Sequence, residues 1–193
     1  KITRTTIHFK DEELIDGIDI KAEEFYRRLK ETDIVPSTSA PSLGEISKRV
    51  EELKAEGCTD VIHFPISFGL SAYGENLLNA FDNMVEGVKL HVFNCHSACL
   101  MEGYCAHYAE ILAERGYTVE EIMDECQKFA DQTVAYLIVD DLKYLVKNGR
   151  LNAVSGLVDL LKLNRFYNWQ KMVLLMYLKK LGLEIGQLIE LKN

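Results

Sequence analysis

The chain has 193 residues, of which 48% are hydrophobic, and its 22 Lys and Arg residues face 30 Asp and Glu residues, giving a formal charge of −8. This apolar content is enough to bury a core and excludes a disordered chain. The absence of a Lys/Arg-rich block disfavours a nucleic-acid partner, because that affinity comes from neutralising phosphates. Charges interrupt every apolar stretch well before roughly 18 residues, so no transmembrane segment is predicted. No apolar signal core follows Lys1, which predicts a cytoplasmic protein.

The number and spacing of the cysteines predict that they are reduced thiols and that they bind no metal. The chain has five, an odd number, and it is too large to need disulfide bonds for stability. None forms the CxxC pair of a structural zinc site. We therefore expect small apolar core residues, and we predict no metal and no cofactor. The five are Cys58, Cys95, Cys99, Cys105 and Cys126.

The first part of the chain predicts a strand followed by two helices. Residues 2–9 alternate like a strand, and residues 21–31 have a helical pattern. Residues 32–41 form a hydroxyl-rich loop that ends at Pro41. A capping box at 42–45 then predicts the start of a helix that ends near Gly57.

From residue 61 onward, strands and helices alternate. Strands are predicted at 61–67, 88–93 and 134–139, and helices at 73–85 and 97–115. A second capping box at 118–121 predicts a helix to about Gln132, and a short helix follows Arg150. Connections of helix length between strands predict an α/β fold with a mainly parallel sheet.

Two loops of this fold are candidates for an anion-binding site. Ligands of parallel sheets sit at the carboxyl ends of strands, where loops lead into helices. The loops at 67–71 and 94–97 carry hydroxyls there, and backbone N–H groups beyond them could receive an anion. The alternative is that Ser71 and Ser97 only cap their helices.

Three short motifs carry a family resemblance. They read TSAPS at 38–42, ISFGLS at 66–71 and LKYLVKNGR at 142–150, and DGIDI at 16–20 precedes Phe25-Tyr26. Together they resemble the DegV family of bacterial fatty-acid-binding proteins, which includes the FakB subunits of fatty acid kinases. The family patterns are TSqPS, ISsxLSGTY, LxYLxkgGRi and DGxDIxxeeFY.

The resemblance implies two α/β domains, the first with a mainly parallel sheet that has helices on both faces. We expect an N-terminal domain at 1–135 and the start of a second domain at 136–193. It further implies a long-chain, palmitate-like fatty acid whose carboxylate is bound by hydroxyls and phosphorylated by a partner kinase. The chain itself is then a lipid-binding protein and no enzyme. By motif, the ligand-binding residues are Thr38, Ser39, Ser71 and Arg150.

The chain also departs from the family pattern. Ala72-Tyr73-Gly74 replaces the family's Gly-Thr-Tyr, Asn94-Cys95 replaces Asp-Ser, and Asn148 replaces a glycine. The family's opening strand is missing ahead of Lys1, and most of its second domain is missing after Asn193. The resemblance therefore implies a family member that is incomplete at both ends.

Residues 164–185 do not resemble the family in the frame as written. Residues 176–183, MYLKKLGL, can be encoded by DNA that reads VFEKVRT in another frame, and the family has EKVRTR in this region. We hypothesise that 164–185 is translated out of frame, by a sequencing error or a pair of indels; the alternative is that the segment forms an amphipathic helix. A clean gene read together with an intact mass that matches this sequence would contradict the sequencing error.

The alternative to lipid binding is an enzyme with a nucleophilic side chain. Cys95-His96-Ser97 at a strand end could form a thiol site, and the chain would then be a hydrolase or transferase acting on a small carboxylate or thioester through Cys95 or Ser71. Adjacent residues in such a turn usually point apart, which weighs against this reading. No phosphate-binding P-loop occurs, so this chain is not expected to bind ATP.

The other candidate ligands have simpler interpretations. We expect His63, His91 and His107 to be structural imidazoles with hydrogen-bond partners, and Asp140-Asp141 to be a solvated strand end rather than a magnesium site.

Overall fold

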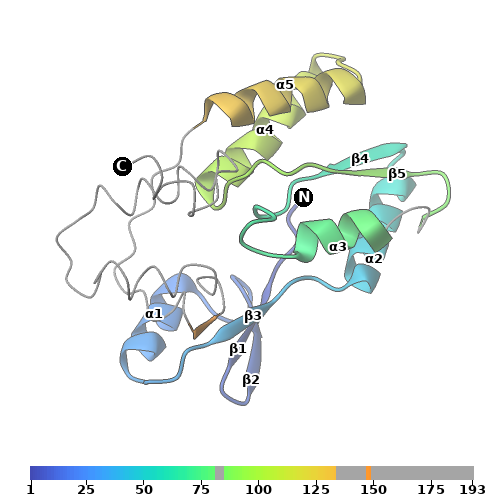
Figure 1. Ribbon diagram of the computed structural model, residues 1–193. Helices are drawn as coiled ribbons and strands as arrows, with labels where there is room; N and C mark the ends of the chain where they lie inside the picture. Colours follow the sequence, from blue (N-terminus) through green and yellow to red (C-terminus); the bar gives the residue numbers. More distant parts are fainter. Residues whose placement is uncertain (81–84, 134–146, 149–193) are drawn as a thin grey trace, which may run out of the picture. The chain divides into compact units, whose positions relative to one another are not determined.

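The computed structural model describes residues 1–80, 85–133 and 147–148 (Figure 1). The chain divides into two compact units, Lys1–Asp131 and Gln132–Asn193. The helices and strands described below lie in the first unit, except for the last residue of the last helix. The expected domain boundary at 135/136, the strand at 134–139 and the helix after Arg150 lie outside the described residues and stay predictions.

The first sheet is antiparallel, with strands in the order β2-β1-β3. It consists of β1 (Thr6–Phe9), β2 (Glu12–Ile15) and β3 (Ser37–Ser39). Two of our predictions were wrong here: the first strand begins at Thr6 rather than Ile2, and the predicted loop at 32–41 contains β3. All three residues of β3 are exposed, so this strand has no alternation of apolar and polar residues that could have indicated it.

Helix α1 (Ala22–Lys30) confirms the helix predicted at 21–31. Its Phe25 ring meets the Phe9 ring of β1 edge-on, with centroids 6.2 Å apart. Ile7 and Phe9 are buried, and they lie on the same face of β1 because residues two apart on a strand point to the same side. The aromatic contact therefore places α1 against the Ile7/Phe9 face of the antiparallel sheet.

Helix α2 (Leu43–Ala55) begins at the predicted capping box. Ser42 Oγ accepts a hydrogen bond from the Glu45 N–H at 3.2 Å, and Glu45 Oε2 accepts one from the Ser42 N–H at 2.8 Å. These two bonds satisfy N–H groups that have no partner within the helix. The hydrogen bond from the Ser42 backbone is the main reason that the pKa of Glu45 lies below its usual range.

We expect Ser42→Ala to lower the free energy of unfolding by about 1 kcal/mol, the usual cost of a lost N-cap side chain. Urea denaturation of the variant and the wild type measures the difference. Ser37→Ala, at an exposed serine of β3, is the control and should change stability by less than about 0.5 kcal/mol. Equal stability of the two variants would show that the capping box contributes nothing.

The second sheet is a parallel pair of strands, β4 (Asp60–His63) and β5 (Lys89–Val92), in which Asp60 pairs with Lys89 and His63 with Val92. β4 is shorter than the predicted strand at 61–67. The Phe93 N–H still donates to the His63 carbonyl at 2.8 Å, but Pro65 has no N–H to continue the ladder, and the chain turns away.

Helix α3 (Tyr73–Ala80) connects the two strands, and α4 (Leu100–Glu114) and α5 (Val119–Gln132) follow β5. The predicted helix at 73–85 is confirmed as far as Ala80, and residues 81–84 lie outside the described part. The second capping box is confirmed, since Thr118 Oγ1 accepts from the Glu121 N–H at 3.3 Å and Glu121 Oε2 accepts from the Thr118 N–H at 2.8 Å.

Helices cover both faces of the parallel pair, as the family resemblance implied (Figure 1). Alternate residues of β4 point to opposite faces. On one face, Ile62 joins a buried cluster with Phe93 and apolar residues of α4 and α5. On the other, Val61 packs against a cluster with residues of α2 and α3, among them Val50 and Leu77. The fold is therefore α/β, with a buried core on each side of this sheet.

Three of the five cysteines are buried members of the α4/α5 cluster, which confirms their prediction as small apolar core residues; they are Cys95, Cys105 and Cys126. Cys58 is partly buried, Cys99 is exposed, and all five are free thiols. Within the residues that the structure describes, no helix is long and apolar enough to cross a membrane.

Candidate functional site

The two candidate loops after β4 and β5 are hydrogen-bonded to each other. The Ser67 N–H donates to the Ser97 carbonyl at 2.8 Å. The side-chain oxygen of Asn94 accepts from the His96 N–H at 3.0 Å and, more weakly, from the Phe68 N–H at 3.5 Å. The carboxyl ends of the two parallel strands therefore lead into one connected loop structure, as expected for a ligand-binding edge of an α/β sheet.

Ser71 lies at the end of this structure, two residues before the first residue of α3. Its backbone N–H donates to the Ser67 carbonyl at 3.1 Å, and its Oγ accepts from the Tyr73 N–H at 3.2 Å. Ser71 thus bonds to the first N–H of α3 in a turn of two residues, whereas the N-cap position is Ala72, whose carbonyl accepts from the Asn76 N–H. Because a hydroxyl that accepts one bond can still donate another, the O–H of this half-buried side chain remains available to an anion.

Ser97 does not cap its helix, so that part of the prediction was wrong. Helix α4 begins at Leu100 rather than at residue 97, and Cys99 at its N-cap makes no side-chain cap hydrogen bond. Ser97 Oγ is buried and has no hydrogen-bond partner among the described residues. His96 and Cys99 both have positive φ, at 52° and 57°, a region that residues other than glycine seldom adopt. Backbone strain of this kind is concentrated at functional loops.

The geometry of Cys95 does not suit a nucleophile. The residue is 5% exposed, whereas the neighbouring His96 is exposed, so the two side chains lie in different environments. Burial is the main cause that raises the pKa of the Cys95 thiol, which keeps it protonated at neutral pH. A reactive cysteine needs the opposite shift, towards the thiolate.

Thr38 and Ser39 lie on opposite faces of β3. In the antiparallel register, Thr38 pairs with Ile7 and Ser39 with Thr6, and directly opposite residues share a face. Ser39 Oγ lies 2.6 Å from His8 Nε2. Thr38 is exposed, and its hydroxyl has no hydrogen-bond partner in the described part of the chain. Of the two neighbours, Thr38 therefore has the free hydroxyl.

The structure does not link all the predicted ligand-binding residues. Ser71 is joined by hydrogen bonds to the loops of β4 and β5, and no hydrogen bond connects it to Thr38. Arg150 lies outside the described residues, as do Asp140-Asp141 and the segment 164–185. The convergence of Thr38, Ser71 and Arg150 on one ligand stays a prediction. The bridging role of Asn94 was not foreseen, although the sequence places it two residues after the end of β5.

The histidines have the structural roles that we expected. His91 Nε2 lies 2.8 Å from Asp60 Oδ1, and His107 Nδ1 lies 3.1 Å from Glu110 Oε2. His63 Nε2 lies 3.1 Å from the hydroxyl of Tyr73. Among the residues that the structure describes, no three His, Cys, Asp or Glu side chains form a group that could bind a metal ion.

His63 should make the stability of the fold depend on pH. Burial lowers its pKa from 6.5 to about 4. The folded state therefore resists protonation between these values, whereas the unfolded state accepts the proton. The stabilisation is fully present above pH 6.5 and is lost as the pH falls towards 4, a total of about 3 kcal/mol for this shift. Urea denaturation at several pH values between 7.5 and 4 would measure it.

The matched comparison is between His63→Gln and His107→Gln, since His107 is exposed. The first variant should show a shallower loss of stability between pH 6.5 and 4 than the wild type, and the second should follow the wild type. If all three proteins lose stability in parallel, His63 is not the group that titrates.

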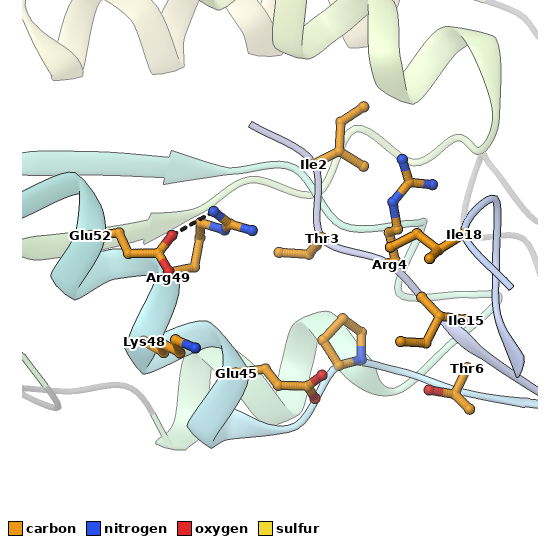
Figure 2. Close-up of a pocket in the computed structure, with 11 residues that line it drawn as sticks. Ile2, Thr3, Arg4, Thr6, Ile15, Ile18, Glu45, Lys48, Arg49 and Glu52 are labelled. Atoms are coloured by element: carbon orange, nitrogen blue, oxygen red, sulfur yellow. Dashed lines mark hydrogen bonds and ion pairs between the residues drawn. The ribbon is translucent and has the colours of Figure 1, made fainter. Parts of the chain in front are cut away.

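A separate pocket of about 290 Å³ lies between the N-terminal segment, the β1–β2 hairpin and α2 (Figure 2). Five charged residues line it, and one pair is bonded, with Arg49 Nη1 2.5 Å from Glu52 Oε2. None of the predicted ligand-binding residues lines this pocket. Charged walls suit an alkyl chain poorly, because burying it there would remove water from the charges. The charged residues are Arg4, Glu45, Lys48, Arg49 and Glu52.

Comparisons with known proteins agree with the resemblance. The model of the family described as "Uncharacterised protein, DegV family" matches residues 2–174, so the match ends inside the segment 164–185. A DegV domain-containing protein of Staphylococcus aureus is 35% identical over 162 residues, which are 83% of this chain and 56% of that protein. The chain thus spans about half the length of the curated relatives that it matches.

Solved structures give the same result. The structure of DegV from Bacillus subtilis, described as a fatty acid binding protein, aligns with a TM-score of 0.73 and 28% identity, covering 81% of this chain and 55% of that one. A DegV family protein from Streptococcus agalactiae, described as fatty acid binding, aligns with a TM-score of 0.72 and 22% identity. The alignment covers 80% of this chain and 56% of that one, and it supports the α/β fold. Since the family model covers most of its length, the chain belongs to the DegV family.

Proposed function

We propose that this chain binds a long-chain, palmitate-like fatty acid, with the carboxylate bound by the hydroxyls of Thr38 and Ser71 and by Arg150. The observation that carries the proposal is the likeness to the Bacillus subtilis DegV structure, which is described as a fatty acid binding protein. The motif residues add a chemical reason, because two hydroxyl donors and one guanidinium suit a carboxylate.

The local geometry of Ser71 and Thr38 supports this assignment. The Ser71 oxygen accepts the Tyr73 N–H, and its own O–H is then free to donate. The Thr38 hydroxyl is exposed and has no partner in the described part of the chain. We assign the direct contact to Thr38 rather than Ser39, because the Ser39 hydroxyl is already hydrogen-bonded to His8. Each buried CH₂ of the tail would contribute about 0.8 kcal/mol.

We further infer that the bound carboxylate is presented to a fatty acid kinase subunit. One carboxylate oxygen would attack the γ-phosphorus of ATP on the partner, giving an acyl phosphate and ADP. This chain supplies the lipid and the partner supplies ATP, so this chain performs no catalysis of its own. Dependence on ATP would place the reaction in the bacterial cytoplasm.

The alternative, a hydrolase or transferase that uses Cys95 or Ser71, has less support. Cys95 is a buried thiol with a raised pKa. The described hydrogen bond to Ser71 Oγ comes from a backbone N–H and not from a general base. Neither side chain has the environment of an activated nucleophile.

Calorimetric titration of the delipidated chain with palmitate and with methyl palmitate tests the proposal. The two ligands share the same tail, and the ester lacks the charged carboxylate. We expect palmitate to bind and the ester to bind about 10-fold or more weakly, the value of a hydrogen bond to a charged group. Equal affinities would show that no carboxylate site exists, and no binding of either would contradict lipid binding altogether.

A further inference from the structure

Tyr73 makes polar contacts through its side chain, which bonds to His63 and to Thr3, and through its backbone N–H. Its hydroxyl lies 3.1 Å from Nε2 of His63, the last residue of β4, and the two rings meet edge-on with centroids 5.7 Å apart. Its N–H donates to Ser71 Oγ at 3.2 Å. A single residue therefore connects the carboxyl end of β4 with the hydroxyl of Ser71.

The two contacts of Ser71 act on different parts of that residue. The hydrogen bond to the Ser67 carbonyl fixes the Ser71 backbone, and the Ser67 backbone is in turn bonded to Ser97. The Tyr73 N–H is bonded to the Ser71 oxygen itself. Because this bond occupies one lone pair of the hydroxyl, it limits the directions in which the O–H can point.

The surroundings of Tyr73 keep it in one place. Its side chain packs against the buried cluster of α2 and α3, and it is the first residue of α3. Burial is the main cause that raises the pKa of Tyr73 to about 12, and burial lowers that of His63 to about 4. Both groups are thus neutral at physiological pH, and the hydrogen bond between them does not depend on a titration in that range.

We propose that His63 and Tyr73 are positioning residues for Ser71: the contact between their side chains places the start of α3 so that the Tyr73 N–H orients the Ser71 hydroxyl towards the ligand carboxylate. This inference rests on the proposed function, in which Ser71 donates to the carboxylate. It adds two residues that touch no ligand, and it gives a role to a polar pair that lies in the largely apolar packing between β4 and α3.

Tyr73→Phe is the variant that tests this role. It removes the hydroxyl, with its bonds to His63 and Thr3, and keeps the backbone N–H and the aromatic ring, so the cluster of α2 and α3 should stay packed. We expect the Kd for palmitate to rise about 3- to 10-fold, a coupling typical of residues in one hydrogen-bond network. The Kd for methyl palmitate should change by less than about 2-fold, because its tail contacts are intact and it has no charged head group.

The measurement is a double-mutant cycle with Ser71→Ala. Once the Ser71 hydroxyl is absent, Tyr73→Phe should cause no further loss of palmitate affinity. His63→Leu removes the other side chain of the pair and should show the same dependence on Ser71. Tyr117→Phe, at an exposed tyrosine between α4 and α5, is the control and should bind palmitate as the wild type does.

The outcomes separate this inference from the function on which it rests. If Ser71→Ala binds palmitate as tightly as the wild type, the carboxylate site is wrongly assigned and the positioning role fails with it. If Ser71→Ala binds weakly but Tyr73→Phe does not, the positioning role alone is wrong. It is equally overturned if Tyr73→Phe weakens both ligands alike, or if its effect persists in the Ser71→Ala background.

Discussion

Ser71→Ala should raise the Kd of this chain for palmitate about 10- to 100-fold, which corresponds to the loss of one hydrogen bond to a charged group, about 1.5–3 kcal/mol. The Ser71 oxygen already accepts the Tyr73 N–H, so its O–H is the group that remains for the carboxylate. The contacts of the tail are unaffected, and binding should therefore weaken without vanishing.

Calorimetric titration of delipidated wild type and variant measures this difference. The Ser71 oxygen also bonds to the first N–H of α3, so the free energy of unfolding should be determined for the same samples, and the loss of one hydrogen bond, about 1 kcal/mol, is expected. Ser37→Ala is the matched control, since this exposed serine of β3 has no predicted contact with the ligand. If Ser71→Ala and Ser37→Ala bind palmitate equally well, Ser71 does not hold the carboxylate.

Gly74→Ala should destabilise the fold by about 1–3 kcal/mol, the usual cost of inserting a methyl group into a packed site. Gly74 is buried in the first turn of α3, and a Cβ there would lie 2.6 Å from Phe68 Cδ1 and 2.9 Å from Pro65 Cγ. The Phe68 ring can rotate, but the Pro65 ring is fixed in the backbone. Steric overlap therefore outweighs the better helix propensity of alanine, which is worth about 1 kcal/mol.

Gly103→Ala is the matched control for this prediction. Gly103 lies in α4, is exposed, and has nothing within 4 Å of the position that a Cβ would take. Here helix propensity acts alone, and we expect a gain of up to about 1 kcal/mol. Urea denaturation of both variants should thus give changes of opposite sign. A gain in stability for both would mean that α3 does not pack tightly against the loop that precedes it.

The surroundings of Gly74 also bear on one departure from the family pattern. The motif that we quoted has glycine directly after the key serine, whereas this chain has Ala72 there and a glycine three positions after Ser71. The structure shows why a glycine is needed at residue 74: α3 approaches the loop at Phe68 and Pro65 too closely for a side chain.

Local signals predicted the helices well. The two capping boxes placed the starts of α2 and α5, because each depends on residues three apart that bond to each other's backbone. The start of α4 was misplaced by three residues, because Ser97 was taken as a cap, whereas its buried hydroxyl makes no hydrogen bond among the described residues. Strand β3 was missed, because an edge strand without buried residues forms only through its pairing with β1.

The sequence predicted which loops carry the candidate residues, but not how these loops contact each other. The motif placed Ser71 before a helix at the end of β4, and the structure agrees. Contacts between residues far apart in sequence could not be predicted. The bond between Ser67 and Ser97 and the bridging Asn94 depend on the pairing of β4 with β5, which no local pattern specifies.

Solvent extraction of the purified chain, followed by mass spectrometry of the extract, tests lipid binding most directly. The measurement needs no assumption about the partner kinase or about the residues that contact the ligand. We predict one long-chain fatty acid per protein molecule, retained through purification and absent from an equal amount of the protein prepared by unfolding and refolding in lipid-free buffer. A folded protein that yields no fatty acid in the extract, and that does not take up palmitate afterwards, would contradict the account.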